Sequence, residues 1–325
     1  MKLLPILAAV TLLPLATVAQ AADHFPYVDE NCGFTHTYEE APTRAVTLSN
    51  NASELMLALG LEGNMVGTSY MANMTISPQY EEAYNSVPIL SPLVATTEQL
   101  IDAEADFVYA GYPDGFSESR NPRPMLHDLG MKTRLNTEGC NLGKFGFDEL
   151  FEEIRSVAGI FGVPERGDAL IADMQARIAA VEERLEGVAP IPVFIYNGGE
   201  DTPRAVLGNT MLSHVVERAG GTNILGEIDN RYGSTSWEQL VEQAPEHIVV
   251  FYSGTSSGQV VDNPEVNLGQ ARVATLEANP IIAGVPAVEN DAYTLIVSVI
   301  GQPGPSSVDA LEKLARAFHP DAFDE

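Results

Sequence analysis

A short internal repeat constrains the fold of this chain more than any other sequence feature. The segment EQLID at residues 98–102 returns 140 residues later (238 − 98) as EQLVE at residues 238–242. The register continues without a gap, so that Asp106 corresponds to Glu246 and Val108 to Ile248. Both copies read as a short amphipathic helix that enters an apolar strand. Self-similarity of this kind predicts two related structural units.

A second correspondence gives the fold class of these units. Residues 55–60 and 212–219 both have the pattern of a helix that is stopped by glycine, at Gly60 and at Gly220. Strand-like runs alternate with the predicted helices, which is typical of α/β folds with largely parallel sheets. The predicted strands are residues 45–48, 65–68, 107–110, 192–196, 248–252 and 293–298.

One long helix is predicted between the two copies, at residues 165–186. Its apolar residues recur at spacings of 3 and 4 and form one stripe: Ile171, Met174, Ile178, Val181 and Leu185. This pattern also suits an ordinary core helix of one unit, but its place between the copies favours a linking helix. We therefore predict an α/β protein with two Rossmann-like lobes, at residues 22–163 and 188–325, joined by a single long rigid helix at residues 164–187, with a ligand cleft between the lobes.

The first 21 residues have the pattern of a cleaved signal peptide. Lys2 precedes an apolar run at residues 3–18, and Ala19-Gln20-Ala21 provides a small-x-small cleavage site. The run is shorter than the roughly 20 residues that cross a bilayer, and it contains two prolines. No cysteine stands at the cleavage point to carry a lipid anchor. We predict export to the periplasm without membrane insertion.

The two cysteines of the chain, Cys32 and Cys140, predict one disulfide, because a lone pair in an oxidising compartment normally bonds. The formal net charge of −28 argues against nucleic acid and anionic lipid as partners. A simpler interpretation of this charge is a solvated acidic surface suited to a saline habitat.

The order of these segments resembles that of the helical-backbone class of ABC-importer binding proteins, which carry iron-siderophore complexes, cobalamin or haem. The resemblance covers nearly the whole mature chain and lies in APTRAVTL at residues 41–48, the Glu-led helices at 98 and 238, the linking helix, AGGTNI at residues 219–224 and the final helix at residues 311–318, which ends in His319-Pro320. It implies a monomeric binding protein, without enzymatic activity or cofactor, that delivers a ferric siderophore or similar metal chelate to a permease dimer. Cobalamin and haem are the alternative cargoes.

The resemblance also implies that Glu98 and Glu238, one on each lobe, dock into basic pockets of the two permease subunits. Symmetry-related carboxylates suit symmetry-related arginines. The alternative is that acidic residues simply favour the N-terminal ends of helices.

A ligand between the lobes should meet the loops at the carboxyl ends of the strands. These loops are rich in tyrosine, which offers a ring for stacking and a hydroxyl for orientation. Arginines in the same regions suit an anionic chelate, and Arg231 is one of them. For any single tyrosine, a place in the core is an equally good expectation. The predicted ligand-binding residues are Tyr70, Tyr112, Arg120, Tyr196, Arg204, Tyr232 and Tyr252.

Two other functions fit parts of the sequence. Ser256 lies in a G-x-S-x-G pattern after a strand, as in a secreted serine hydrolase, but the sequence that follows does not resemble the required helix. A binding protein for bare metal ions would need clustered histidines, and the six histidines are scattered along the chain. We therefore predict neither a catalytic residue nor a protein metal site.

Overall fold

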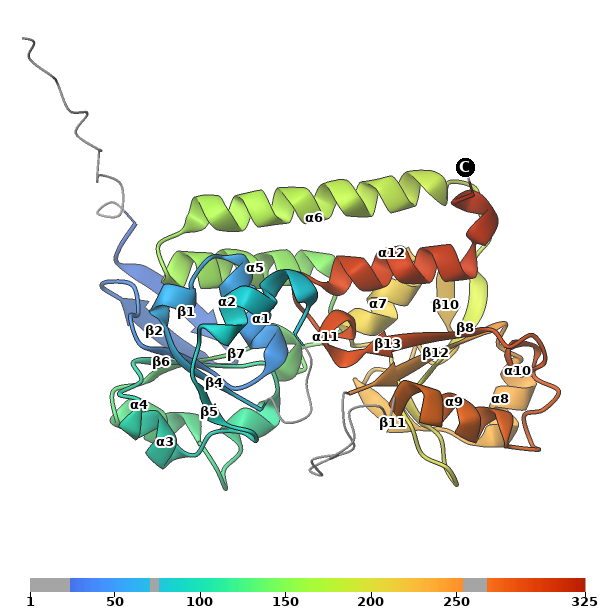
Figure 1. Cartoon of the computed structure of the whole chain (residues 1–325), viewed down its shortest axis with the longest axis horizontal. Helices are drawn as coiled ribbons and strands as arrows, with labels where there is room; N and C mark the ends of the chain where they lie inside the picture. The colour runs from blue at the N-terminus through green and yellow to red at the C-terminus, as the bar shows by residue number, and fades with distance from the viewer. Residues whose placement is uncertain (1–23, 71–75, 254–267, 325) are drawn as a thin grey trace, which may run out of the picture.

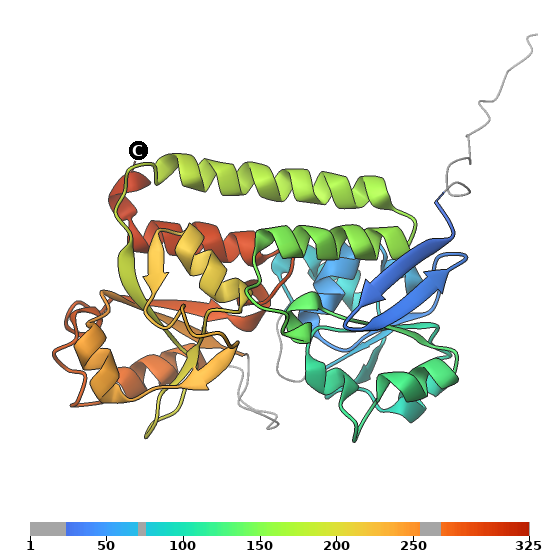
Figure 2. The ribbon, with the colours of Figure 1, turned by 180° about the vertical axis from the view of Figure 1, so that it is seen from behind.

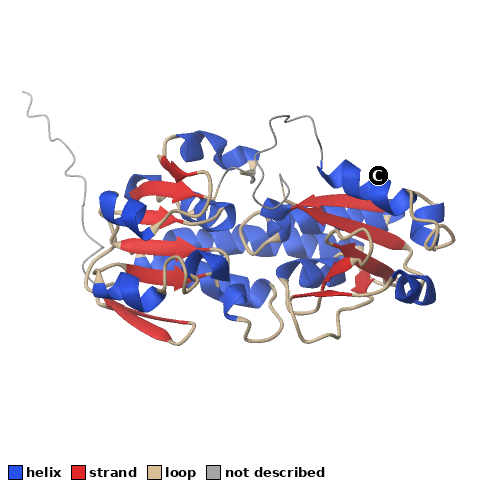
Figure 3. Cartoon of the chain, turned by 90° about the horizontal axis from the view of Figure 1, so that it is seen from below, coloured by secondary structure: helices blue, strands red, loops and turns tan. Residues whose placement is uncertain are grey.

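The computed structural model describes residues 24–70, 76–253 and 268–324, which form two lobes covered on one side by a long helix (Figure 1). The predicted signal peptide lies outside the described residues. Figure 3 shows the strands gathered in two separate groups, one in each lobe.

The sheet of the first lobe has the strand order β5-β4-β3-β6-β7, and every pair in it is parallel. Its central strands β3 and β6 are buried along their whole length, as expected for a sheet covered on both faces. The strands are β3 (Ala45–Thr47), β4 (Met65–Ser69), β5 (Ile89–Ser91), β6 (Phe107–Ala110) and β7 (Lys132–Leu135).

The sheet of the second lobe repeats this arrangement. The strand β8 lies between β10 and β12, as β3 lies between β4 and β6, and these pairs are parallel, as is β12 with β13. Two antiparallel strands, β9 and β11, extend the sheet beyond β8. The strands are β8 (Ile191–Tyr196), β9 (Arg204–Val206), β10 (Gly221–Asn223), β11 (Tyr232–Ser234), β12 (His247–Tyr252) and β13 (Tyr293–Val297).

The internal repeat is a structural repeat. The helices α3 (Thr97–Asp102) and α8 (Trp237–Gln243) each begin after a hydroxyl that accepts a hydrogen bond from a backbone N–H, from Gln99 to Thr96 and from Gln239 to Ser236. Each helix buries one leucine completely, Leu100 or Leu240. After each helix the chain passes through a left-handed residue, Glu104 or Ala244, before it enters β6 or β12.

The long helix α6 (Pro164–Arg184) has 21 residues, and four residues of the predicted stripe are buried, from Ile171 to Val181. Figures 1 and 2 show α6 lying over α5 (Phe147–Ile160) of the first lobe and α12 (Ser307–Phe318) of the second. One hydrophobic core includes Leu150 of α5, Met174 of α6 and Leu311 of α12. The lobes are therefore joined by a shared core as well as by the linking helix. The sequence predicted the helix but not the shared core.

An antiparallel hairpin precedes the first lobe, formed by β1 (Tyr27–Asn31) and β2 (Phe34–Tyr38). Cys32 lies in its turn and forms a disulfide with Cys140, across a Cα–Cα distance of 5.4 Å. The predicted disulfide is thus present in the structure. It fixes the hairpin to the 3₁₀ turn at Thr137–Cys140.

Shorter helices complete the lobes, and no helix in the described ranges is both long and apolar enough to cross a membrane. They are α1 (Asn50–Ala58), α2 (Glu81–Asn85), α4 (Arg123–Asp128), α7 (Met211–Arg218), α9 (Leu268–Glu277), α10 (Pro286–Glu289) and α11 (Ser298–Gly301). The predicted helices at residues 55–60 and 212–219 correspond to α1 and α7.

Candidate ligand-binding site between the lobes

Two of the predicted tyrosines lie together in the first lobe. Tyr70 follows β4 and Tyr112 follows β6, so both leave the sheet at its carboxyl edge. Their ring centroids are 5.8 Å apart in an edge-to-face arrangement, and both residues are half-buried. The Tyr112 hydroxyl donates a hydrogen bond to Oδ1 of Asn50, at 3.5 Å. The two rings form one aromatic patch at this edge of the sheet.

Tyr232 supplies a third ring from the second lobe. It opens β11, and its hydroxyl accepts a hydrogen bond of 3.3 Å from Nε2 of Gln302. Burial raises the pKa of Tyr232 to about 12. Burial also raises the pKa of Tyr112, and the next largest cause is the nearby Tyr232. The structure therefore brings tyrosines of both lobes close to each other, and their part in ligand binding stays a prediction.

A buried ion pair crosses between the lobes at the same place. Arg231, next to Tyr232, donates from Nη2 to Oε1 of Glu138 at 2.6 Å and from Nε at 3.1 Å. The other carboxylate oxygen accepts the backbone N–H of Met211 at 2.7 Å. Burial raises the pKa of Glu138, opposed by Arg231. Burial lowers the pKa of Arg231, but Glu138 and the nearby Tyr232 and Tyr112 together oppose this and raise it.

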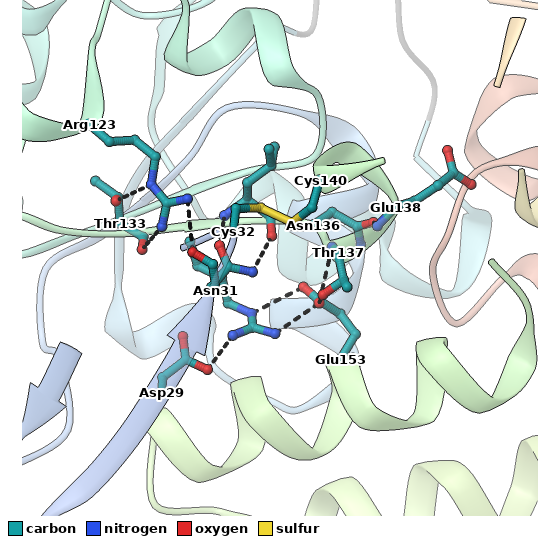
Figure 4. The surroundings of a disulfide bond; sticks show 12 residues. Asp29, Asn31, Cys32, Arg123, Thr133, Asn136, Thr137, Glu138, Cys140 and Glu153 are labelled. Carbon is teal, nitrogen blue, oxygen red and sulfur yellow. Dashed lines mark hydrogen bonds and ion pairs between the residues drawn. A yellow bond between two sulfur atoms is a disulfide. The ribbon is translucent and has the colours of Figure 1, made fainter. Parts of the chain in front are cut away.

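The disulfide holds the turn that carries Glu138. Figure 4 shows Glu138 reaching away from the bond between Cys32 and Cys140. The hairpin is also held by Arg134, whose buried guanidinium lies between Asp29 of the hairpin and Glu153 of α5. Sequence analysis overlooked Glu138, and its position two residues before Cys140 was the available signal.

A second buried glutamate joins the lobes. Oε2 of Glu54, in α1, accepts a hydrogen bond of 2.9 Å from the hydroxyl of Ser306 in the second lobe. Oε1 accepts the backbone N–H of Ser77 at 2.5 Å. Burial raises the pKa of Glu54 to about 7, so its protonation changes near neutral pH.

Tyr196 does not belong with the other tyrosines. Only 1% of its surface is exposed, and it packs against Trp237 with ring centroids 6.0 Å apart. Its hydroxyl donates to the carbonyl of Gly199 at 2.8 Å. Because Tyr196 lies in the core of the second lobe, we leave it out of the proposed site.

The remaining predicted residues lie at the ends of strands or in loops. Tyr252 ends β12 and is half-buried. Arg120 is exposed in the loop before α4, where its carbonyl accepts a hydrogen bond from Thr97. Burial raises the pKa of Tyr70, and the nearby Arg120 opposes this shift. The part of Arg120 and Tyr252 in ligand binding stays a prediction.

Arg204 converges with a second arginine, Arg272 of α9, which sequence analysis missed. A Cβ placed on Gly198 would lie 3.3 Å from Nη2 of Arg204 and 3.2 Å from Nη2 of Arg272. Arg272 also donates to the carbonyl of Phe251 at the end of β12. Within the described ranges, neither guanidinium has a carboxylate at ion-pair distance. Two cations therefore meet at the carboxyl ends of β8 and β12.

Glu98 and Glu238 are exposed at the beginnings of α3 and α8, at equivalent places in the two lobes. The pKa of Glu98 is lowered by hydrogen bonds from the backbone N–H of Glu98 and from Thr96.

Ser256 lies outside the described residues. Among those described, no group of three or more His, Cys, Asp or Glu side chains is arranged to hold a metal ion.

Two α/β lobes joined by a long helix, with aromatic side chains converging between them, define a two-lobed solute-binding protein. The family model for periplasmic binding proteins matches residues 46–295, and the chain belongs to this family.

Known proteins similar to the chain include components of ABC transporters. An uncharacterized ABC transporter substrate-binding lipoprotein of Bacillus subtilis is 22% identical, over 94% of this chain and 90% of its own. A cobalamin-binding protein of Halobacterium salinarum is 23% identical, over 93% of this chain and 76% of its own. The solved structure of an ABC-type Fe3+-hydroxamate transport system protein from Saccharomonospora viridis is 25% identical, with a TM-score of 0.75, over 91% of this chain and 99% of its own.

Proposed function

We propose that this protein binds a ferric siderophore, or a similar anionic metal chelate, between its lobes in the periplasm and delivers it to the permease of an ABC importer. It acts as an exported monomer and without catalysis. Family membership and the similarity to an Fe3+-hydroxamate transport protein support this function. The pair formed by Arg204 and Arg272 is the observation that favours an anionic ligand.

The composition of the chain makes this arginine pair informative. The protein has 45 acidic residues and only 17 lysines and arginines, so we expect an arginine side chain to have a carboxylate partner. Arg44, Arg134, Arg155, Arg177, Arg218 and Arg231 each pair with a carboxylate. Two guanidinium groups held together repel each other unless an anion lies between them. A carboxylate or catecholate oxygen of the ligand would supply that anion through charge-assisted hydrogen bonds.

The tyrosines contribute the apolar part of the proposed site. Tyr70, Tyr112 and Tyr232 offer ring faces and edges from both lobes, which suit a large chelate with flat groups. The same rings suit cobalamin or haem, and the similarity to a cobalamin-binding protein favours cobalamin as the second candidate. Ser256 has no catalytic part in this proposal.

Delivery would use Glu98 and Glu238. Because the two glutamates occupy equivalent positions in related lobes, they match a permease dimer with one basic pocket in each subunit. Reversing both charges, Glu98→Lys with Glu238→Lys, is expected to abolish transport and leave ligand affinity nearly unchanged. Loss of ligand affinity in this variant would place the glutamates in the ligand site instead.

Ligand titration tests the proposed cargo. Native mass spectrometry of the exported protein identifies a bound chelate, and fluorescence of Trp237 follows titration with ferric carboxylate, catecholate and hydroxamate siderophores, cyanocobalamin and haemin. The double variant Arg204→Ser with Arg272→Ser should weaken anionic chelates about 150-fold or more, because each of the two hydrogen bonds to a charged group contributes about 1.5–3 kcal/mol. Neutral hydroxamate chelates should lose much less affinity.

The matched control is Arg155→Ser, which removes an exposed arginine that pairs with Glu152 on the surface of α5. It should bind every ligand as the wild type does. Tight binding of cyanocobalamin alone, unaffected by the double variant, would replace the siderophore proposal with cobalamin. A wild type that binds none of the chelates would overturn both.

A further inference from the structure

Ile101 on α3 and Val241 on α8 are aliphatic side chains at equivalent positions of the repeat (241 − 101 = 140), and both face solvent. Their exposed fractions are 46% and 47%. Each lies three residues after the exposed glutamate of its helix, Glu98 or Glu238, and hence on the same helix face. Both lobes therefore present a carboxylate beside an aliphatic group.

The local backbone gives the two combinations the same shape. The helices α3 and α8 share a hydroxyl cap, a completely buried leucine and a left-handed residue at the end, as described above. The next residue after each aliphatic group, Asp102 or Glu242, is a further exposed acid. We call Glu98, Ile101 and Asp102 the first knob, and Glu238, Val241 and Glu242 the second knob. The helices α3 and α8 that carry the knobs lie on the side of the molecule away from α6 (Figure 1).

The charge of the knobs restricts what can cover them. Each knob carries two carboxylates, so an anionic lipid surface or the same face of a second copy would repel it. A suitable partner offers a basic group beside an apolar surface, and it offers this combination twice. A two-fold dimer presents identical sites of this kind.

We propose that Ile101 and Val241 are the apolar anchors of the surface that docks on the permease dimer. The inference rests on the proposed function and adds residues to it. An exposed ion pair contributes little to binding, because water screens it and both side chains must be ordered. A neighbouring aliphatic group that becomes covered in the complex excludes water from the ion pair and adds buried apolar area. Because of the repeat, each lobe has both an exposed carboxylate and a neighbouring aliphatic group.

Binding to the permease measures the contribution of each anchor. The probe is the complete ABC importer of the same organism in nanodiscs, and the protein is used without a chelate, so that the ligand's identity does not matter. Ile101→Ser and Val241→Ser should each weaken binding about 5- to 10-fold, and the double variant about 25- to 100-fold, since distant interface sites act nearly independently. The conservative exchange Ile101→Val with Val241→Ile should bind as the wild type does.

Control variants separate this inference from the proposed function. Val188→Ser alters an aliphatic residue of 38% exposure beyond the end of α6 and should not change permease binding. Thermal denaturation should show that all variants fold equally well, because the substituted groups are exposed. If Glu98→Lys with Glu238→Lys loses permease binding while both serine variants keep it, the inference is wrong and the docking proposal stands. If the wild type itself does not bind the importer, both are wrong.

Discussion

Arg231 of the second lobe donates two hydrogen bonds to one carboxylate oxygen of Glu138 in the first lobe, at 2.6 and 3.1 Å. The pair is buried, with exposed fractions of 13% and 3% for the two side chains. It lies beside Tyr232, whose ring is 5.3 Å from the Arg231 guanidinium carbon. One of the contacts that join the lobes therefore lies beside a tyrosine of the proposed ligand site.

Breaking this ion pair from one side should be costly. Glu138→Ala leaves Arg231 and the Met211 N–H without their acceptor, and the free energy of unfolding should fall by about 3–5 kcal/mol. Replacing both partners with apolar residues, Glu138→Leu with Arg231→Met, should cost much less, because no buried charge remains. Urea denaturation measures the free energy of unfolding of both variants and of the wild type.

The exposed pair of Glu152 and Arg155 is the control for this measurement. Glu152→Ala should change the free energy of unfolding by less than about 1 kcal/mol. A loss in Glu138→Ala no larger than in Glu152→Ala would show that the interlobe pair does not stabilise the protein.

The disulfide should account for a large share of the stability. It closes a loop of 108 residues, and the chain-entropy model gives about 4–5 kcal/mol for a loop of that length. Cys32→Ser with Cys140→Ser should lower the free energy of unfolding by about that amount. Alkylation followed by intact-mass analysis should find two reactive thiols only after reduction. Two thiols that react in the oxidised native protein would contradict the bond.

Single substitutions should distinguish tyrosines of the site from those of the core. Tyr70→Ala, Tyr112→Ala, Tyr232→Ala and Tyr252→Ala should each weaken ligand binding by about 1–3 kcal/mol, or about 5- to 150-fold. Tyr196→Phe should bind normally, since it loses only a hydroxyl that donates to Gly199. Isothermal titration with the chelate identified by mass spectrometry gives the affinities. Normal affinity in all four alanine variants would reject the tyrosine-lined site.

The free energy of unfolding should depend on pH, because two buried histidines and one buried glutamate have opposite effects on it. Burial lowers the pKa of His247 to about 4, so between about pH 6.5 and 4 the unfolded chain binds a proton that the folded protein does not, and acid destabilises the fold. Burial likewise lowers the pKa of His36 to about 4, which acts in the same direction. Glu54, with a pKa of about 7, is protonated in the folded protein first, so it favours the fold as the pH falls from 7 to 4.5.

Two variants separate these contributions. His247→Gln should lose less stability than the wild type between pH 6.5 and 4, because it no longer takes up a proton on unfolding. Glu54→Gln should lose more, because the opposing effect is gone. Urea midpoints at pH 4.5, 5.5, 6.5 and 7.5 follow both slopes. Parallel curves for all three proteins would contradict the assignment.

The shared core under α6 should limit movement between the lobes. Leu150, Met174 and Leu311 belong to one cluster that extends through both lobes, and such packing resists bending. Small-angle scattering should therefore show little compaction when a chelate binds. Ala substitution of Met174, whose side chain is 1% exposed, should lower stability by about 2–5 kcal/mol. A large compaction of the wild type would reject a largely preformed site.

The local pattern of the sequence determined the parts of the fold that depend on a residue's nearest neighbours. All six predicted strands form, and the stripe from Ile171 to Val181 is buried in α6. Apolar periodicity reports which side of an element avoids water, whatever its partner is. The strands β9 and β11 and the hairpin of β1 and β2 were not predicted, because polar residues or glycine interrupt their apolar pattern.

Tertiary structure alone decided which polar groups meet. Glu138 and Arg231 are 93 residues apart in the chain, and Arg204 and Arg272 come from a strand and a helix that share no local motif. Tyr196 follows the same sequence pattern as Tyr112, yet the packing of the second lobe against Trp237 buries it. Side-chain chemistry is encoded residue by residue, but the partner of a charge or a ring is set by how distant segments pack, and that packing distinguished the core tyrosine from those between the lobes.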